Sequence, residues 1–267
     1  MTTTDTQFQG SIPGIYDEYL GPLLFEPYAE DLAARLRGFD KGVLLETAAG
    51  TGIVTRALAQ VLSPDVRLVA TDLNEAMLEV AARHVTATSV SWKQADAQRL
   101  PFGDAEFGVV VCQFGIMFMP DKAAAFREAR RVLAPAGRFV FNVWDRLEAN
   151  EVSHVVNQAV AKVFPHDPPR FFERTPFGYC DPLVIRGELE KAGFQQVAIE
   201  SVEKASSVST PDAPATGLCK GTPLRAEIEA RGPGRLDEIT AVASEALAAR
   251  FGRSFENRMR ALVVMAS

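Results

Sequence analysis

The stretch Val43–Arg56 constrains the fold of this chain more than any other. It opens with an apolar run typical of a short buried strand and closes with a segment whose apolar residues share one face of a helix. Between the two, Gly50 and Gly52 permit a sharp turn and let a ligand approach where a side chain would block it. The start of the helix offers free amide groups and the positive end of the helix dipole. The stretch therefore predicts a loop that binds a small molecule with a negatively charged end.

Two details of this loop narrow the class of ligand. The dinucleotide fingerprint has glycine at its first, third and sixth positions, whereas the run Ala48–Ile53 has glycine at neither its first nor its sixth. Glu46 ends the strand just before the loop, where its carboxylate suits a ligand that carries an ammonium group as well as a carboxylate. This combination indicates the amino-acid end of S-adenosylmethionine, with Glu46, Ala48, Gly50 and Gly52 as its contacts.

An acid also follows the second predicted strand, residues 66–71. At the tip of this strand in an alternating strand–helix fold, Asp72 is placed to accept hydrogen bonds from both hydroxyls of a ribose. Asn74 is typical of a helix N-cap. We therefore expect the side chains of Leu73 and Met77 to pack against the nucleobase of the ligand.

A third predicted strand, residues 89–95, ends at Asp96 and Ala97. We expect the Asp96 carboxylate to accept a hydrogen bond from an adenine amine, and the next backbone amide to donate one to the ring. The three strand ends together predict a site for the whole nucleoside.

The fourth predicted strand, residues 107–111, is a continuous apolar run of the kind that is buried on both faces. Strands and helices alternate throughout this half of the chain, which favours a parallel sheet with helices on both sides. In a doubly wound sheet the ligand lies at the carboxyl ends of the strands. Gln113 and Phe114, at the end of the fourth strand, are therefore candidates for the place where cofactor and substrate meet.

Composition excludes several classes of protein. Of the 267 residues 47% are apolar and 23% are charged, as in a soluble globular protein. The net charge of -6 argues against a main role in holding a phosphate backbone, so we expect a small-molecule substrate and no nucleic acid. The polar N-terminus does not resemble a signal peptide, and no apolar run is long enough to span a bilayer. Three widely spaced cysteines predict reduced thiols in a cytoplasmic protein and no metal site.

Candidates for catalysis lie outside the alternating half. The segment 146–180 is rich in prolines and aromatic residues, and we expect it to cap the ligand and shape the substrate pocket. His154 and His166 lie in this cap, where each is either a general base or a packing or surface histidine. Tyr16 and Tyr19 have helical spacing before the first strand. Either they only pack, or they belong to a lid in which Tyr19 contacts the cofactor and Tyr16 orients the acceptor.

Four pieces of the sequence, in this order and spacing, resemble the class I S-adenosylmethionine-dependent methyltransferases of the type-11 group. They are Glu46–Gly52, Asp72–Leu78, Ala95–Ala97 with Leu100–Phe102, and Leu133–Arg138. The family usually has glycine where this chain has Ala48, a change that keeps a small residue. The resemblance implies a Rossmann-like, mostly parallel sheet of seven strands. Its last strand would be antiparallel, here residues 261–265 inserted beside residues 194–202.

The expected organisation is a single domain in four segments. Residues 1–40 form the N-terminal lid, a frayed tail up to about Ser11 followed by two short helices. Residues 41–145 form the cofactor-binding core, with its fifth strand over residues 138–144, residues 146–180 the substrate cap and residues 181–267 the completion of the sheet. Within the last segment we expect a loop around Pro211 and Pro214, followed by a helix over residues 236–250.

The expected activity is methyl transfer to a small molecule by in-line displacement. Holding donor and acceptor close contributes on the order of 7 to 11 kcal/mol, so a general base is needed mainly for a hydroxyl or an acidic carbon. Two alternatives stay open on sequence alone: a nicotinamide-dependent oxidoreductase on a related sheet, and a non-catalytic S-adenosylmethionine-binding protein. The acceptor atom and the oligomeric state are also open.

Overall fold

A computed structural model describes residues 10, 12–85, 87 and 89–267, so the predicted frayed tail up to Ser11 lies outside the described residues except for Gly10. Contacts divide the chain into two compact units. The sheet unit comprises Tyr28–Trp144, Tyr179–Val202 and Ala261–Ser267, and the helical unit comprises the chain up to Pro27, Asp145–Gly178 and Glu203–Arg260. These units do not follow the four predicted segments, because residues 1–40 divide at Pro27 and residues 181–267 contribute to both units.

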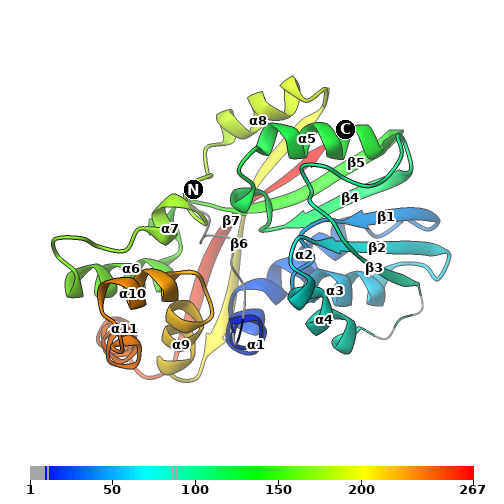
Figure 1. Cartoon of the computed structure of the whole chain (residues 1–267). Helices are drawn as coiled ribbons and strands as arrows, with labels where there is room; N and C mark the ends of the chain where they lie inside the picture. The colour runs from blue at the N-terminus through cyan, green and yellow to red at the C-terminus, as the bar shows by residue number, and fades with distance from the viewer. Residues whose placement is uncertain (1–9, 11, 86, 88) are drawn as a thin grey trace. The chain divides into compact units, whose positions relative to one another are not determined.

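The sheet has seven strands in the order β3-β2-β1-β4-β5-β7-β6 (Figure 1). Neighbouring strands from β3 to β5 are parallel, whereas β7 runs antiparallel to β5 and lies between β5 and β6. The predicted fold class and the insertion of the last strand are thereby confirmed. The strands are β1 Gly42–Glu46, β2 Val66–Asp72, β3 Val90–Gln94, β4 Phe107–Gln113, β5 Leu133–Trp144, β6 Val197–Val208 and β7 Phe255–Ala266.

Helices cover both faces of the sheet in the sheet unit, with α3 and α4 on one side and α5 and α8 on the other (Figure 1). Side-chain caps fix where two of them begin: Asp121 accepts a 2.8 Å bond from the Ala124 amide, and Asp181 accepts one of 2.8 Å from the Leu183 amide. The helices of this unit are α2 Glu26–Arg35, which begins two residues before the boundary, α3 Ile53–Val61, α4 Glu75–His84, η3 Ile116–Phe118, α5 Lys122–Val132 and α8 Pro182–Lys191.

One expectation about the helical unit, the loop around Pro211 and Pro214, is wrong. Residues around Pro211 and Pro214 form helix α9 rather than a loop, and a further helix, α10, follows it. Pro211 is the N-cap and Pro214 lies in the first turn, where a missing amide hydrogen removes no intrahelical bond. The helices of this unit are α1 Ile12–Ile15, η2 Tyr16–Phe25, η4 Leu147–Ala149, α6 Glu151–Val163, α7 Phe171–Arg174, α9 Asp212–Lys220, α10 Leu224–Arg231 and α11 Leu236–Phe251.

Two other boundaries differ from expectation. The two short helices predicted before the first strand are one continuous helical run, because the π-helix η2 joins α1 to α2 without a break. β5 begins at Leu133 rather than at Arg138, because Leu133 already pairs with Phe107 across a register shift in β4. Among the described residues, none of the helices combines the length and the apolar character that crossing a membrane would require.

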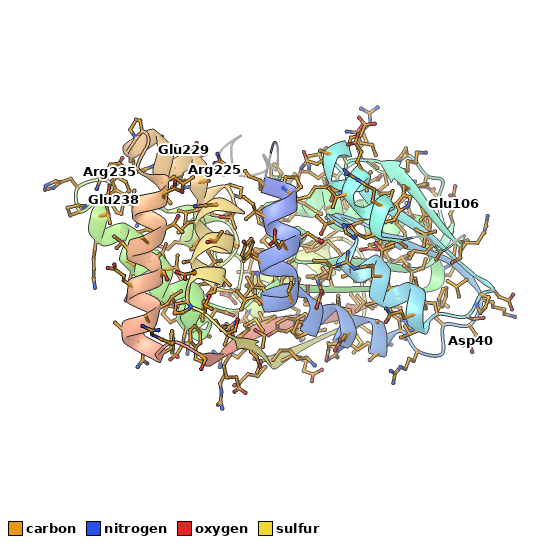
Figure 2. The ribbon with its side chains drawn as sticks, turned by 90° about the horizontal axis from the view of Figure 1, so that it is seen from below. Asp40, Glu106, Arg225, Glu229, Arg235 and Glu238 are labelled. Carbon is orange, nitrogen blue, oxygen red and sulfur yellow. The ribbon has the colours of Figure 1, made fainter. Side chains whose placement is uncertain are left out.

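Charged side chains at the rim of the helical unit are paired with one another. Arg225 lies 3.0 Å from Glu229, and Arg235 lies 2.8 Å from Glu238, each pair on one helical face (Figure 2). Exposed pairs of this kind contribute little to stability, because solvent and salt screen their charges. They show how arginines of this surface are neutralised locally rather than left as a basic patch.

Candidate functional site

The carboxyl edge of the parallel strands collects most of the residues singled out in the sequence. Glu46, at the end of β1, is in register with Ala70 of β2 and Val111 of β4, and Asp72 is in register with Gln94 of β3. The strand order reverses at β1, which has β2 on one side and β4 on the other. This is the topological switch point at which doubly wound sheets bind their ligands.

The loop between β1 and α3 is built from left-handed residues. Ala48, Gly50 and Gly52 have φ values of 53°, 57° and 82°. A Cβ atom on Gly52 would lie 3.0 Å from the Cβ of Ala81 in α4, so glycine permits the close approach of that helix. A Cβ atom on Gly50 would meet nothing within 4 Å. The backbone at Gly50 therefore faces open space, as a ligand-binding loop requires.

Asp72 is tied directly to this loop. Its Oδ2 accepts a 2.8 Å bond from the Gly50 amide, and its Oδ1 accepts one of 2.8 Å from the Asn74 amide. The side chain is buried, and burial raises its pKa although both amide bonds oppose the shift. Asp72 therefore fixes the loop and the end of β2 to each other through a single carboxylate.

Glu46 lies beneath the loop rather than at its surface. The residue is 1% exposed, and its Oε2 accepts a 2.7 Å bond from the Thr55 hydroxyl of α3. The pKa of its carboxyl group is raised to about 8, mainly by burial and also by the nearby negative charge of Asp72, while the Thr55 bond opposes the shift. Among the described residues, none contributes a positive charge to the pKa of either carboxyl group. The site thus holds two buried acids that no cation of the described residues neutralises.

The nucleoside candidates follow on β2, α4 and the end of β3. Leu73 is 52% exposed, which is unusual for a leucine and makes its side chain available to a ligand, whereas Met77 is buried. Asp96 and Ala97 are half-buried, and the Ala95 amide donates a 3.0 Å bond to the carbonyl of Asp72. The structure therefore brings the proposed ribose and adenine residues to adjoining strand ends.

The tip of β4 is strained. Phe114 has a φ of 49°, a left-handed conformation that costs a non-glycine residue about 1 to 2 kcal/mol. Its amide donates a 2.9 Å bond to Oδ1 of the buried Asn142, and its ring stacks on Trp144 at 3.8 Å. The ring is only 5% exposed, and Gln113 beside it is half-buried. Contacts from β5 therefore compensate the strain at this strand end.

Four candidates belong to the helical unit instead. Tyr16 stacks on Phe25 at 4.7 Å, and Tyr19 is half-buried on the same π-helix. His154 Nε2 lies 2.8 Å from Gln158 Nε2, and its buried Nδ1 has no hydrogen-bond partner among the described residues. His166 is exposed in the turn after α6.

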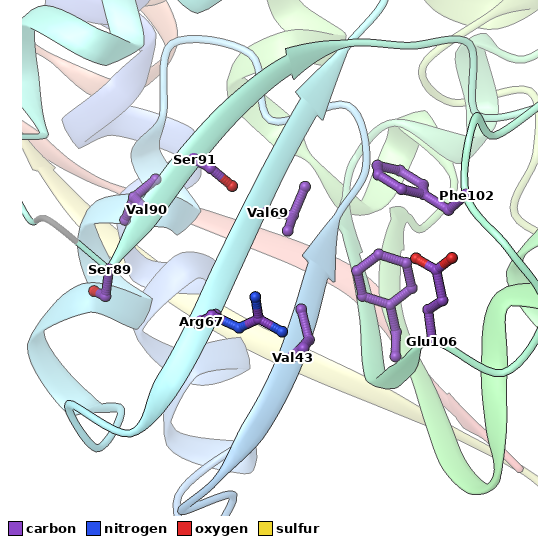
Figure 3. Close-up of a pocket in the computed structure, with 9 residues that line it drawn as sticks. Val43, Arg67, Val69, Ser89, Val90, Ser91, Phe102 and Glu106 are labelled. Carbon is purple, nitrogen blue, oxygen red and sulfur yellow. The ribbon is translucent and has the colours of Figure 1, made fainter.

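A cavity of about 540 Å³ lies elsewhere on the sheet (Figure 3). The connection from β3 to β4 contains no helix, and side chains near the amino ends of the strands line the cavity, among them Val43, Arg67 and Phe107. The acids of the candidate site stand at the opposite, carboxyl ends. The cavity is therefore separate from the residues that the sequence predicts to bind the cofactor.

Several residues of the site escaped the sequence analysis. Thr55 bonds Glu46, Asn142 holds the tip of β4, and Gln98 bonds Asp96. The Thr51 hydroxyl is buried without a hydrogen-bond partner among the residues that the structure describes. A hydroxyl between the two glycines of the loop was the available signal for Thr51, whereas the others depend on tertiary contacts.

Comparisons with known proteins agree with this geometry. Residues 45–141 match the model of a methyltransferase domain family. A ubiquinone/menaquinone biosynthesis C-methyltransferase of Caulobacter sp. (strain K31) is 29% identical over 189 residues, covering 64% of this chain and 75% of that protein. The enzyme of the same name from Ectopseudomonas mendocina (strain ymp) is 36% identical over 125 residues, covering 45% and 46%.

Solved structures show the same fold. The Haemonchus contortus phosphoethanolamine N-methyltransferase 2 in complex with S-adenosyl-L-methionine aligns with a TM-score of 0.64 at 16% identity, covering 100% of this chain and 60% of that one. A methyltransferase from Aquifex aeolicus aligns with a TM-score of 0.54 at 16% identity, covering 71% and 91%.

Proposed function

Since the chain belongs to the class I S-adenosylmethionine-dependent methyltransferases, we propose that it methylates a small-molecule acceptor and that the carboxyl edge of β1 to β4 binds the cofactor. The curated relatives are named as C-methyltransferases of quinone biosynthesis, which supports a small acceptor. The net charge of -6 supports a role without nucleic acid, and we propose a cytoplasmic location and no metal requirement.

The observation that carries the proposal is the pair of buried acids. Glu46 and Asp72 both have raised pKa values, and no cation neutralises either one within the described chain. S-adenosylmethionine supplies a sulfonium, whose methyl group is the one transferred, and an ammonium group. A ligand with two positive charges would stabilise the ionised carboxyl groups, so the residues present fit this cofactor.

We assign the remaining contacts by position. The Asp72 carboxylate accepts from the ribose hydroxyls, and the exposed Leu73 side chain covers the adenine ring together with Met77. Asp96 and the amide of Ala97 recognise the edge of the adenine.

The loop between β1 and α3 binds the amino-acid end of the cofactor. Ala48, Gly50 and Gly52 shape the backbone around it. The Thr51 hydroxyl, which has no hydrogen-bond partner among the described residues, supplies a donor for a carboxylate. Gln113 and Phe114 form the border of the site at the end of β4, on the side of the transferred methyl group.

Catalysis rests mainly on alignment and on exclusion of water. A base is needed if the acceptor is an acidic carbon or a hydroxyl. His154 is the first candidate, since its Nδ1 is buried without a recorded partner in the described chain, and the exposed His166 ranks below it. Tyr19 is proposed as a further cofactor contact and Tyr16 as a group that orients the acceptor.

The test incubates the protein with methyl-labelled S-adenosylmethionine and a set of small acceptors that includes hydroquinones, phenols and amines. The expected result is transfer of label to one chemical class, accompanied by S-adenosylhomocysteine. Label that stays on a tightly bound cofactor with every acceptor class would instead favour a non-catalytic binding protein. The oxidoreductase alternative requires quenching of nicotinamide fluorescence on binding, which we do not expect.

A further inference from the structure

Gln98 lies in the turn after β3 and makes three hydrogen bonds at once. Its backbone amide donates to Asp96 Oδ1 at 2.8 Å, and its side-chain Nε2 donates to the same oxygen at 3.0 Å. Its Oε1 accepts a 2.8 Å bond from the Asp121 amide at the start of α5. One side chain therefore joins the end of β3 to the segment that follows β4.

These bonds divide the two oxygens of Asp96 into different environments. Oδ1 takes both bonds from Gln98, whereas Oδ2 has no recorded hydrogen bond within the part of the chain that the structure describes. A carboxylate with one oxygen held by two donors is fixed in rotation, and its second oxygen keeps its lone pairs for another donor. The adenine amine, which the proposed function assigns to Asp96, is a donor of the required kind.

The far end of Gln98 is itself anchored. Asp121 caps α5 through its 2.8 Å bond to the Ala124 amide. The Gln98 amide group is thus oriented by a rigid helix start, with its NH2 toward Asp96 and its oxygen toward Asp121. An apolar side chain would lose both the donor and the acceptor, and a carboxylate would lose the donor.

We propose that Gln98 is a positioning residue for nucleobase recognition, which holds Asp96 so that Oδ2 faces the exocyclic amine of the adenine. This inference rests on the proposed function, because Asp96 must be the adenine contact. Gln98 itself is not proposed to touch the cofactor. Its role is to restrict Asp96 to the rotamer that binds.

The first test measures binding of S-adenosylhomocysteine and of S-inosylhomocysteine, which has a carbonyl in place of the amine, by calorimetry. Gln98→Leu is expected to weaken S-adenosylhomocysteine binding about threefold to tenfold, the value of one neutral hydrogen bond. It should also reduce the preference for the adenine compound. In an Asp96→Asn background the same substitution should change affinity less than about twofold, since coupled residues are not additive.

A second variant separates positioning from a purely structural role. Gln98→Glu keeps the acceptor for the Asp121 amide but replaces the donor to Asp96 with a second carboxyl group. Two adjacent carboxyl groups share a proton at low pH and repel at high pH. We therefore expect binding by Gln98→Glu to weaken as the pH rises from 5 to 8, relative to the native protein and to the control Arg99→Gln, an exposed neighbour.

Three results would overturn the inference while the cofactor assignment stands. They are unchanged base preference in Gln98→Leu, an equal loss in the Asp96→Asn background, and native-like binding by Gln98→Glu at every pH. Failure of the native protein to bind S-adenosylhomocysteine is a different outcome, because it contradicts the proposed function itself.

Discussion

The Gly50 amide donates a 2.8 Å hydrogen bond to Oδ2 of Asp72, which joins the glycine loop after β1 to the end of β2. The two residues are 22 positions apart in sequence, and each is placed by its own strand. Both belong to the proposed cofactor site, so the ligand-binding edge is partly organised before a ligand arrives. Pre-organisation of this kind reduces the ordering cost of binding.

Cofactor affinity is expected to rise with pH between 6 and 8. The Glu46 carboxyl has a pKa of about 8 and is mostly protonated at pH 6. A cationic ligand favours the ionised form, so binding releases a proton and the affinity increases by up to about tenfold per pH unit. Calorimetry in two buffers of different ionisation enthalpy measures the released proton. Glu46→Gln keeps an acceptor for the Thr55 hydroxyl and should abolish the release; undiminished release in this variant would contradict the role of Glu46.

The same group makes the ligand-free fold less stable as the pH rises. Because its pKa is raised from 4.5 to about 8, the folded state binds more protons than the unfolded state in this interval. The free energy of unfolding should therefore fall between pH 5 and pH 8, by about 3 kcal/mol more in the native protein than in Glu46→Gln. Urea denaturation at both pH values measures the difference. Parallel profiles for the two proteins would show that the Glu46 carboxyl is ionised in the ligand-free fold.

Ala48 and Gly115 are expected to be energetically coupled. A Cβ atom on Gly115 would lie 2.5 Å from the Ala48 Cβ and 2.7 Å from the Cys112 Sγ. Gly115→Ala should therefore destabilise the protein by about 1 to 3 kcal/mol. Ala48→Gly removes one of the two clashes, so the double variant should recover at least about 0.5 kcal/mol relative to additivity. Thermal unfolding of the native protein, the two single variants and the double variant tests this coupling. Strictly additive changes in the free energy of unfolding would contradict a contact between the two residues.

Asn142 should be needed for the left-handed turn at Phe114. Asn142→Leu has a similar volume but removes the side-chain acceptor, so the buried Phe114 amide keeps only its 3.2 Å bond to the Asn142 carbonyl, and the loss should cost about 0.5 to 1.5 kcal/mol in the free energy of unfolding. Asn142→Asp retains an acceptor but adds a buried charge. It should therefore be less stable at pH 8 than at pH 5. A native-like denaturation midpoint for Asn142→Leu would mean that the stacking on Trp144 and the bond to the Asn142 carbonyl hold the turn without the side-chain acceptor.

The sheet and its edge could be read from the sequence because their signals are local. Apolar runs bounded by Gly50 and Asp72 identify strands and strand ends, and parallel topology then brings those ends together. Helix α9 was not predicted because Pro211 and Pro214 are typical of a loop. Both are also compatible with the start of a helix, which is where they lie.

Other features could not be read from local pattern at all. The burial of Glu46 beneath the loop depends on where α3 packs, and the strain at Phe114 depends on β5, 28 residues away. Gln98 looks like an ordinary polar turn residue until Asp121 is known to lie next to it. Tertiary contacts, rather than propensity, decide these positions.

Cofactor binding at the carboxyl edge is best tested by calorimetric titration of S-adenosylmethionine and S-adenosylhomocysteine into the native protein, Asp72→Ala and the control Asp65→Ala. Asp65 is an exposed acid just before the amino end of β2, so its variant makes the same charge change at the opposite edge of the sheet. We expect the native protein and the control to bind both ligands, and Asp72→Ala to bind them at least about tenfold more weakly, a loss of about 1.4 kcal/mol. Equal affinity in all three proteins, or no binding by the native protein, would contradict this expectation.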